Sequence, residues 1–200
     1  MTERPTLDFW FEFASTYSYL ATMRIGPLAK SCGVTVRWRP FLLGPIFKAQ
    51  GWDNSPFNLY PIKGRYMWRD LERICAALDL PFVRPAQFPQ NTLLAARVAI
   101  AALTEDWGED FCRALYRAEF GEGRNLAEPQ TIAAVLTALG QDAGAVMRRA
   151  QDDTVKGALR AQTEEAQRIG IFGAPAFVTA DGELFWGNDR LEAALDWALR

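Results

Sequence analysis

The stretch that decides the fold is Asp8-Phe-Trp-Phe-Glu-Phe-Ala-Ser15-Thr-Tyr-Ser18-Tyr-Leu20. Its phenylalanines occupy every second position up to Phe13, which is the period of a β-strand. The alternation ends at Ala14, and apolar residues then recur at the spacing of a helix. The sequence therefore predicts a strand that passes directly into a helix whose first turn carries Ser15 and Ser18.

The start of this predicted helix offers a place for an anion. A helix N-terminus presents unpaired N–H groups and the positive end of the helix dipole. Ser15-x-x-Ser18 also has the spacing of the Cys-x-x-Cys motif of thioredoxin-like redox proteins, with oxygens in place of both sulfurs. The alternative is that Ser15 is an ordinary helix cap.

The composition favours a soluble protein with a sizeable core. The chain has 200 residues, 50% of them hydrophobic, and a net charge of -2, which gives no reason to expect nucleic acid or a membrane as partner. No apolar run approaches the roughly 18 residues of a membrane span, and residues 1–5 do not read as a signal peptide. Three widely spaced cysteines fit a reducing compartment. We therefore expect a cytoplasmic protein.

The chain contains no histidine. This excludes Ser-His-Asp and Cys-His mechanisms and most zinc sites, and we expect no metal site. A general acid or base must therefore be Asp, Glu, Lys, Tyr or a group of the ligand. Since no histidine can deprotonate Ser15, we do not expect this residue to be a conventional nucleophile.

Strands are expected near both ends of the chain. Gly33 is a plausible stop for the first helix, and residues 34–38 alternate like a strand, so a parallel βαβ unit is predicted. Residues 175–179 and 183–186 read as strands around Asp181-Gly182, which is a strong hairpin turn signal. A last amphipathic helix ends the chain.

The middle of the chain reads as helical, after loop composition at Gly44-Pro45 and at residues 51–56. The predicted helices are marked by Met67, Leu71, Ile74 and Leu78, by Leu94, Val98 and Ala101, by Phe111 and Leu115, by Ile132, Val135, Leu136 and Leu139, and by Val155, Leu159, Ala166 and Ile169. This order predicts an α/β fold in which a thioredoxin-like domain, residues 1–42 and 156–200, is interrupted by a large all-helical insertion at residues 43–155.

A thiolate is the anion best matched to such a helix start, and it must come from outside because the sequence has no cysteine there. A hydrogen bond from Ser15 to a charged group contributes roughly 1.5–3 kcal/mol, and a helix terminus adds up to about 2 kcal/mol. At roughly 1.4 kcal/mol per pKa unit, these contributions can lower the pKa of a bound thiol by about two units. Such a thiol is largely thiolate at neutral pH.

A second candidate segment, Gly170-Ile-Phe-Gly-Ala174-Pro175, precedes the first C-terminal strand. A Pro that begins a strand with a trans peptide bond is the ordinary interpretation. Thioredoxin-like folds, however, place a cis-Pro at this strand, facing the first helix, and we therefore predict a cis bond before Pro175. The backbone of Ala174 would then pair with a peptide ligand like an added strand.

Further polar residues have both a functional and an ordinary interpretation. Asn188, Asp189 and Arg190 fit a helix start capped by Asn188. The same segment could bind an amino-acid head group, with N–H groups on its carboxylate and Asp189 on its ammonium. Asn54 and Lys63, taken alone, are ordinary solvated residues.

The chain as a whole resembles the kappa-class glutathione transferases and the 2-hydroxychromene-2-carboxylate isomerases. Residues 11–20 resemble that family's Phe-x-Ser-Pro-Tyr-Ser-Tyr-Leu segment, with Thr16 in place of the Pro. The other matching segments are Leu43-Gly-Pro-Ile-Phe-Lys48, Lys63-Gly-Arg-Tyr-Met67, Asn91-Thr-Leu93, Gly170-Ile-Phe-Gly-Ala-Pro175 and Leu184-Phe-Trp-Gly-Asn-Asp-Arg190-Leu191. The Phe-Trp-Gly-x-Asp-Arg form is closer to the bacterial isomerases, whereas residues 51–56 are longer than the family's usual Gly-Asn.

The resemblance implies a DsbA-like arrangement and a cytoplasmic homodimer with glutathione as cofactor. Ser15 would hold the glutathione sulfur as the catalytic residue, and Ala174 and Pro175 would pair with its cysteinyl backbone. The other glutathione-binding positions would be Asn54, Lys63, Asn188, Asp189 and Arg190, the last two at the γ-glutamyl end.

The resemblance also implies the reaction: glutathione-dependent cis–trans isomerisation of 2-hydroxychromene-2-carboxylate to a trans-hydroxybenzylidenepyruvate in aromatic (naphthalene-type) catabolism. The substrate would be a small aromatic α-keto acid, whose carboxylate Lys63 could bind. Trp10, Phe47 and Tyr66 are candidates either for an apolar slot or for the core. The alternatives are a kappa-class transferase or peroxidase acting on small electrophiles, and a non-catalytic thiol- or peptide-binding module. A dithiol oxidoreductase is not expected, because Ser15 has no sulfur to oxidise.

Overall fold

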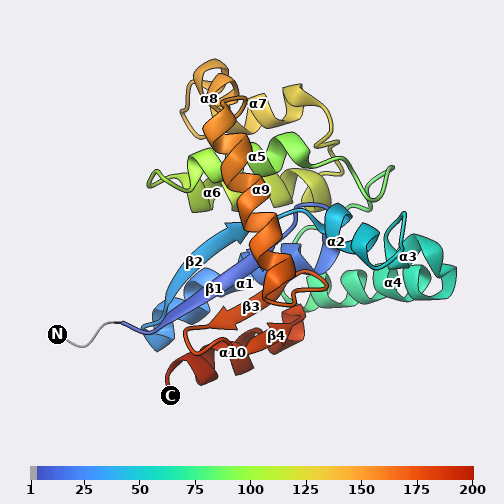
Figure 1. The fold of residues 1–200 in the computed structure, drawn as a ribbon. Coiled ribbons are helices and arrows are strands. Elements are labelled where there is room, and N and C mark those ends of the chain that lie inside the picture. Colours follow the sequence, from blue (N-terminus) through green and yellow to red (C-terminus); the bar gives the residue numbers. More distant parts are fainter. Residues whose placement is uncertain (1–3) are drawn as a thin grey trace.

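The computed structural model describes residues 4–200, in which a small sheet lies among many helices (Figure 1). The elements in chain order are β1 (Thr6–Phe11), α1 (Thr16–Cys32), β2 (Thr35–Pro40), α2 (Leu43–Ala49), α3 (Pro56–Leu59), α4 (Pro61–Ala77), α5 (Leu93–Ala102), α6 (Gly108–Tyr116), the π-helical turn η1 (Arg117–Gly121), α7 (Pro129–Ala138), α8 (Ala143–Arg149), α9 (Asp153–Arg168), β3 (Ala176–Thr179), β4 (Leu184–Trp186), the 3-10 turn η2 (Asn188–Arg190) and α10 (Leu191–Ala198). The predicted change from strand to helix between residues 8 and 20 is confirmed.

The four strands form one sheet in the order β2-β1-β3-β4. β1 and β2 are parallel, as the βαβ prediction requires, and α1 between them stops at Gly33, whose φ of 74° is left-handed. β3 runs antiparallel to both β1 and β4. The predicted hairpin turn is present, with Gly182 at a φ of 90°.

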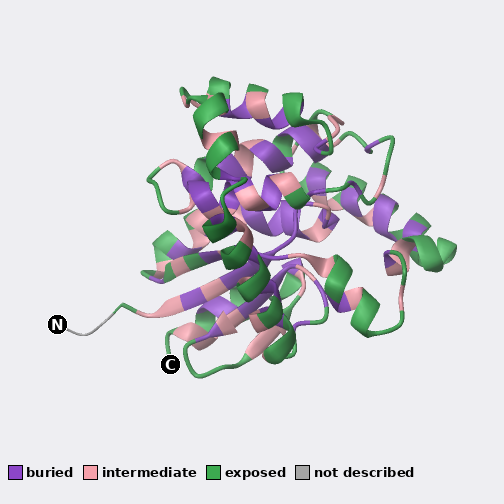
Figure 2. Cartoon of the chain, turned by 45° about the horizontal axis from the view of Figure 1, so that its top comes forward, coloured by how far each residue is buried: buried purple, intermediate pink, exposed green. Residues whose placement is uncertain are grey.

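β1 is buried on both faces, which the alternating pattern did not indicate. On one face Phe9 packs against Trp38 and Phe177, with ring centroids 5.1 and 5.5 Å away, in a cluster that includes residues of α1 and α10. On the other face Trp10 packs against Phe41 and against Ala166 of α9. Trp10 is therefore a core residue. Figure 2 shows the buried residues concentrated in the sheet and on the inner sides of the helices.

The chain between β2 and α9 contains only helices and connections, in agreement with the predicted helical composition. The division at residues 42/43 and 155/156 stays a prediction, and α9 spans the second of these positions. One local interpretation was wrong: Gly44-Pro45 lies inside α2 rather than in a loop. A Pro in the first helical turn lacks only an N–H that would have no intrahelical partner, and the N–H of Leu43 finds an acceptor in Glu12.

In the part of the chain that the structure describes, none of the helices has the length and apolar character that crossing a membrane requires.

Candidate active site

The first turn of α1 is capped by Ser15. Its hydroxyl accepts a hydrogen bond from the N–H of Ser18 at 3.3 Å, and its backbone is extended, as expected for a residue that precedes a helix. The cap interpretation is therefore correct. It leaves the N–H groups of Thr16 and Tyr17, the first two helical residues, without intrahelical acceptors.

The same hydroxyl joins α1 to the segment before β3. The Oγ of Ser15 donates to the carbonyl oxygen of Ala174 at 2.9 Å, across 159 positions of sequence. The peptide bond between Ala174 and Pro175 is cis, as predicted. The structure thus brings the two predicted halves of the site into direct contact.

This contact lies in the wall of a cavity of about 1420 Å³. Ligand pockets commonly measure about 300–1000 Å³, so the cavity is large enough for a tripeptide together with a second molecule. Two aromatic pairs line it, Phe172 with Trp186 and Phe47 with Trp52, at centroid distances of 4.9 and 5.7 Å. Tyr66 also lines the cavity, so Phe47 and Tyr66 lie where an apolar slot would need them.

Asn54 and Lys63 line the same cavity as Ser15. The side-chain oxygen of Asn54 accepts from the N–H of Ser55 at 2.7 Å, and the ammonium of Lys63 lies 4.9 Å from the centroid of the Tyr60 ring. Lys48 provides another cation in the lining. The sequence analysis included Lys48 in a segment that matches the resembled family but gave it no role.

The segment Asn188–Arg190 does not line the cavity, nor does Pro175. Asn188 is buried, and its side-chain oxygen accepts from the guanidinium of Arg24 at 2.9 Å. Asn188 is therefore not a helix cap, and that interpretation was wrong: the side chain bonds to a distant helix rather than to a backbone N–H. Asp189 and Arg190 are exposed and lie 3.6 Å apart. Glutathione binding by these residues stays a prediction.

Glu12 is a lining residue that the sequence analysis missed. Its buried carboxyl accepts from the hydroxyl of Thr92 and from the N–H groups of Leu43 and Ala14, the last two at 3.0 and 3.4 Å. Burial raises the pKa of Glu12, and these hydrogen bonds oppose the rise. The alternation of Glu12 with Phe11 and Phe13 did not indicate this burial, because it predicts that the side chain of Glu12 faces solvent.

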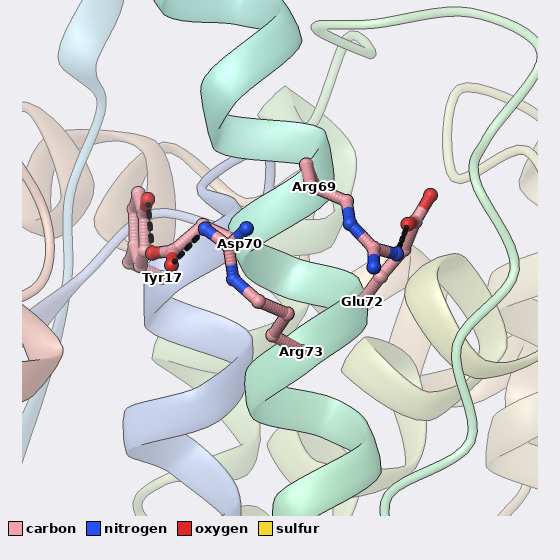
Figure 3. Close-up of polar contacts among 5 residues, drawn as sticks. All are labelled: Tyr17, Arg69, Asp70, Glu72 and Arg73. Atoms are coloured by element: carbon pink, nitrogen blue, oxygen red, sulfur yellow. Dashed lines mark hydrogen bonds and ion pairs between the residues drawn. The ribbon is translucent and has the colours of Figure 1, made fainter.

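Tyr17 connects the first turn of α1 to α4 (Figure 3). Its hydroxyl donates to Asp70 at 3.0 Å, and the other oxygen of Asp70 lies 3.2 Å from Arg73. Burial and then the bond to Asp70 raise the pKa of Tyr17, so the phenol is neutral at physiological pH. The second ion pair in the view, Arg69 with Glu72, is exposed on α4. This link fixes one wall of the cavity to the helix start.

The residues present fit a bound thiol-containing peptide. The hydroxyl of Ser15 and the free N–H groups at the start of α1 suit a thiolate. The buried hydroxyl of Thr16, which lines the cavity, has no hydrogen-bond partner. None of the three cysteines lines the cavity, so among the described residues any thiol at this site belongs to a ligand.

Comparison with known proteins agrees with this geometry. A family model described as a DSBA-like thioredoxin domain matches residues 6–197. The chain belongs to this family. A solved structure of a 2-hydroxychromene-2-carboxylate isomerase is similar to it with a TM-score of 0.86 and 28% identity, covering 97% of this chain and 94% of the other. The thioredoxin-like α/β fold is therefore shown.

Two kinds of enzyme are found among the relatives by sequence. A 2-hydroxychromene-2-carboxylate isomerase of Sphingobium xenophagum is 32% identical over 188 residues, 94% of each chain. Human glutathione S-transferase kappa 1 is 29% identical over 200 residues, covering 94% of this chain and 88% of the relative. The isomerases and kappa-class transferases that the resemblance named are thus relatives over almost the whole chain.

Proposed function

We propose that this protein is a glutathione-dependent isomerase that converts 2-hydroxychromene-2-carboxylate, or a close analogue, into a trans-hydroxybenzylidenepyruvate. The observation that carries the proposal is the 2.9 Å contact between the hydroxyl of Ser15 and the carbonyl of Ala174 in the wall of a large cavity. A hydroxyl at this position can hold a thiolate but cannot form a disulfide.

Bound glutathione would supply a thiolate that adds reversibly to a conjugated α-keto acid and so permits rotation about its former double bond. Ser15 would donate its hydroxyl hydrogen to the thiolate instead of to Ala174. The freed carbonyl of Ala174 could then accept from the N–H of the cysteinyl residue. The N–H groups of Thr16 and Tyr17 would stabilise the negative charge.

The rest of the cavity fits an aromatic acid. Phe47 and Trp52 form an apolar surface on one wall, and Lys48 and Lys63 can neutralise a carboxylate. Placing such a substrate against the thiolate makes the addition effectively intramolecular, which is a large contribution to rate. The likeness to proteins named 2-hydroxychromene-2-carboxylate isomerase supports this substrate over other aromatic acids.

A kappa-class glutathione transferase is the second candidate. Relatives named as such are 26–29% identical over nearly all of this chain. In that reaction glutathione is consumed, so turnover with chlorodinitrobenzene without any isomerisation would favour it. Glutathione binding without turnover on either substrate would favour a binding module.

The remaining expectations are part of the proposal. We propose a homodimer in the cytoplasm that binds neither nucleic acid nor membranes and holds no metal. The three cysteines are free, which suits a reducing compartment. Size-exclusion chromatography with light scattering tests the dimer.

The first experiment follows the isomerisation by absorbance, with and without glutathione, for wild type, Ser15→Ala and Ser18→Ala. A hydrogen bond to a charged group is worth roughly 1.5–3 kcal/mol, so we expect Ser15→Ala to lose about 10- to 150-fold in kcat/KM. Ser18→Ala is the matched control, since it keeps the backbone N–H that bonds to Ser15 and removes a buried hydroxyl that does not line the cavity.

The ultraviolet absorbance of the bound thiolate, followed against pH, gives an independent measurement of the pKa of the glutathione thiol. This pKa should rise in Ser15→Ala and stay unchanged in Ser18→Ala. Turnover that does not depend on glutathione would refute the proposed mechanism. Equal losses in both variants would show that the helix start matters only as structure.

A further inference from the structure

The carboxyl group of Glu12 is the meeting point of three chain segments that line the cavity. Its Oε2 accepts from the N–H of Leu43 at 3.0 Å, at the start of α2. Its Oε1 accepts from the hydroxyl of Thr92, just before α5, and from the N–H of Ala14, which adjoins Ser15. Glu12, Leu43, Thr92, Ala14 and Ser15 all line the cavity.

We propose that Glu12 is a positioning residue, whose carboxylate holds the starts of α2 and α5 at a fixed distance from Ser15. The proposal deepens the proposed function and rests on it for the reaction that is measured. It concerns the wall where α2 carries Phe47 and Lys48, and not the glutathione wall formed by Ser15 and Ala174.

The charge of Glu12 is what makes this arrangement work. Two of its partners, the N–H groups of Leu43 and Ala14, can only donate, and they lie on different oxygens of the carboxyl. The ionised carboxylate accepts from both, whereas a proton on either oxygen faces one of these N–H groups or must be donated to the hydroxyl of Thr92. Burial and then the charge of Glu12 raise the pKa of Glu119, and both buried oxygens of Glu119 lack hydrogen-bond partners. Of these two neighbouring acids, only Glu12 accepts hydrogen bonds that stabilise a carboxylate, so the proposal assigns Glu12 as the anion and Glu119 as the neutral acid.

The groups that face Glu12 come from four elements. α6 contributes Tyr116, whose hydroxyl donates to the backbone carbonyl of Glu12 at 2.7 Å, and η1 contributes Glu119. The start of α5 contributes Thr92, and α2 contributes the N–H of Leu43 and carries Lys48, which lines the same cavity. Burial outweighs the hydrogen bonds and raises the pKa of Glu12, so protonation begins at a less acidic pH than for an exposed glutamate and releases the α2 wall.

The variant Glu12→Gln tests the proposal, because it removes the charge and replaces one of the two acceptor oxygens by an NH2 donor. A displacement of about 1 Å from productive geometry costs on the order of 100-fold in rate. We expect kcat/KM for the aromatic acid to fall by about that factor, mainly through KM, while the Kd for glutathione measured by calorimetry changes less than about threefold. Thr92→Val removes one donor only and should lose about tenfold.

Hydrogen exchange gives a measurement that does not need turnover. The protection factor of the Leu43 amide, corrected for intrinsic exchange, should fall on acidification in wild type and in Thr92→Val. In Glu12→Gln it should be low and independent of pH, while protection in residues 176–186 is unchanged.

Unchanged protection of the Leu43 amide in Glu12→Gln would overturn the proposal. Equal losses of substrate binding and glutathione binding would also overturn it, because they would indicate a general role of Glu12 in folding. If wild type neither binds glutathione nor turns over the substrate, the proposed function fails, and the protection data alone still decide whether Glu12 positions α2.

Discussion

Gly64 is the position where a single methyl group should move a wall of the cavity. It is a buried residue of α4, and a Cβ added there would lie 2.3 Å from the backbone carbonyl oxygen of Phe57 in α3. An ordinary carbon–oxygen contact is about 3.3 Å, so Gly64→Ala requires α3 and α4 to separate by about 1 Å. All the contacted atoms of Phe57 are backbone, so no flexible side chain can move away to relieve the contact.

Two opposing effects determine the stability of Gly64→Ala. Overpacking of this kind costs about 1–3 kcal/mol, whereas Ala is favoured over Gly within a helix by about 1 kcal/mol. The expected net loss is therefore about 0–2 kcal/mol. Gly157→Ala isolates the second effect, because Gly157 is an exposed residue of α9 with nothing within 4 Å of an added Cβ.

Thermal or denaturant unfolding of the two variants measures the difference. Gly157→Ala should raise Tm by about 2–4 °C, which corresponds to about 1 kcal/mol for a protein of this size. Gly64→Ala should be less stable than Gly157→Ala by about 1–3 kcal/mol. α3 carries Phe57 and α4 carries Lys63, and both residues line the cavity. Gly64→Ala should therefore lose more turnover of the aromatic acid than its loss of stability alone would cause. Equal stabilisation by the two substitutions would refute the close packing of α3 on α4.

Two further predictions concern the core. Phe9→Ala should lower the free energy of unfolding by about 3–5 kcal/mol in urea titrations, whereas Phe172→Ala, which alters a half-exposed ring, should change it by much less; equal effects would contradict the described core. Burial raises the pKa of Glu119 well above its ordinary value of 4.5. The folded state therefore retains a proton that the unfolded chain releases. The free energy of unfolding should fall as the pH rises from about 4.5 to the pKa of the folded state. Glu119→Gln should remove this loss and be the more stable form at pH 7, and an unchanged pH dependence would contradict the assignment of a neutral Glu119.

The parts of the fold that sequence could predict are those with local causes. The change of period before Ser15 predicted β1 and α1, and Gly33 and Asp181-Gly182 marked a helix end and a hairpin through backbone conformations that glycine adopts easily. Burial of Trp10 on the second face of β1 was not predictable in this way, because a period of two describes one buried face and says nothing of a helix such as α9 that covers the other.

The candidate site shows the same difference between residues with local signals and residues whose contacts are distant in sequence. Ser15 could be singled out from its place at a helix start, and Ala174 from the order of the elements. Asn188 was misread, because its partner Arg24 is 164 positions away and nothing nearby in sequence indicates the contact. Gly44-Pro45 was interpreted as a loop for a related reason: nothing nearby in sequence indicates that Glu12 accepts from the N–H of Leu43 at the start of α2.

These misses share a physical origin that bears on how the site works. The wall that we propose to bind the thiol is built from the start of α1 and the segment before β3, whose geometry follows from the sheet to which both are joined. The opposite wall belongs to α2, α3 and α4, which pair with no strand and are placed by side-chain contacts such as those of Glu12 and Tyr17. If the proposed function holds, we expect binding of glutathione to depend on the α/β framework and the choice of aromatic substrate to depend on the polar contacts that position the helices. Loss of one such contact can alter substrate use without removing the thiol site.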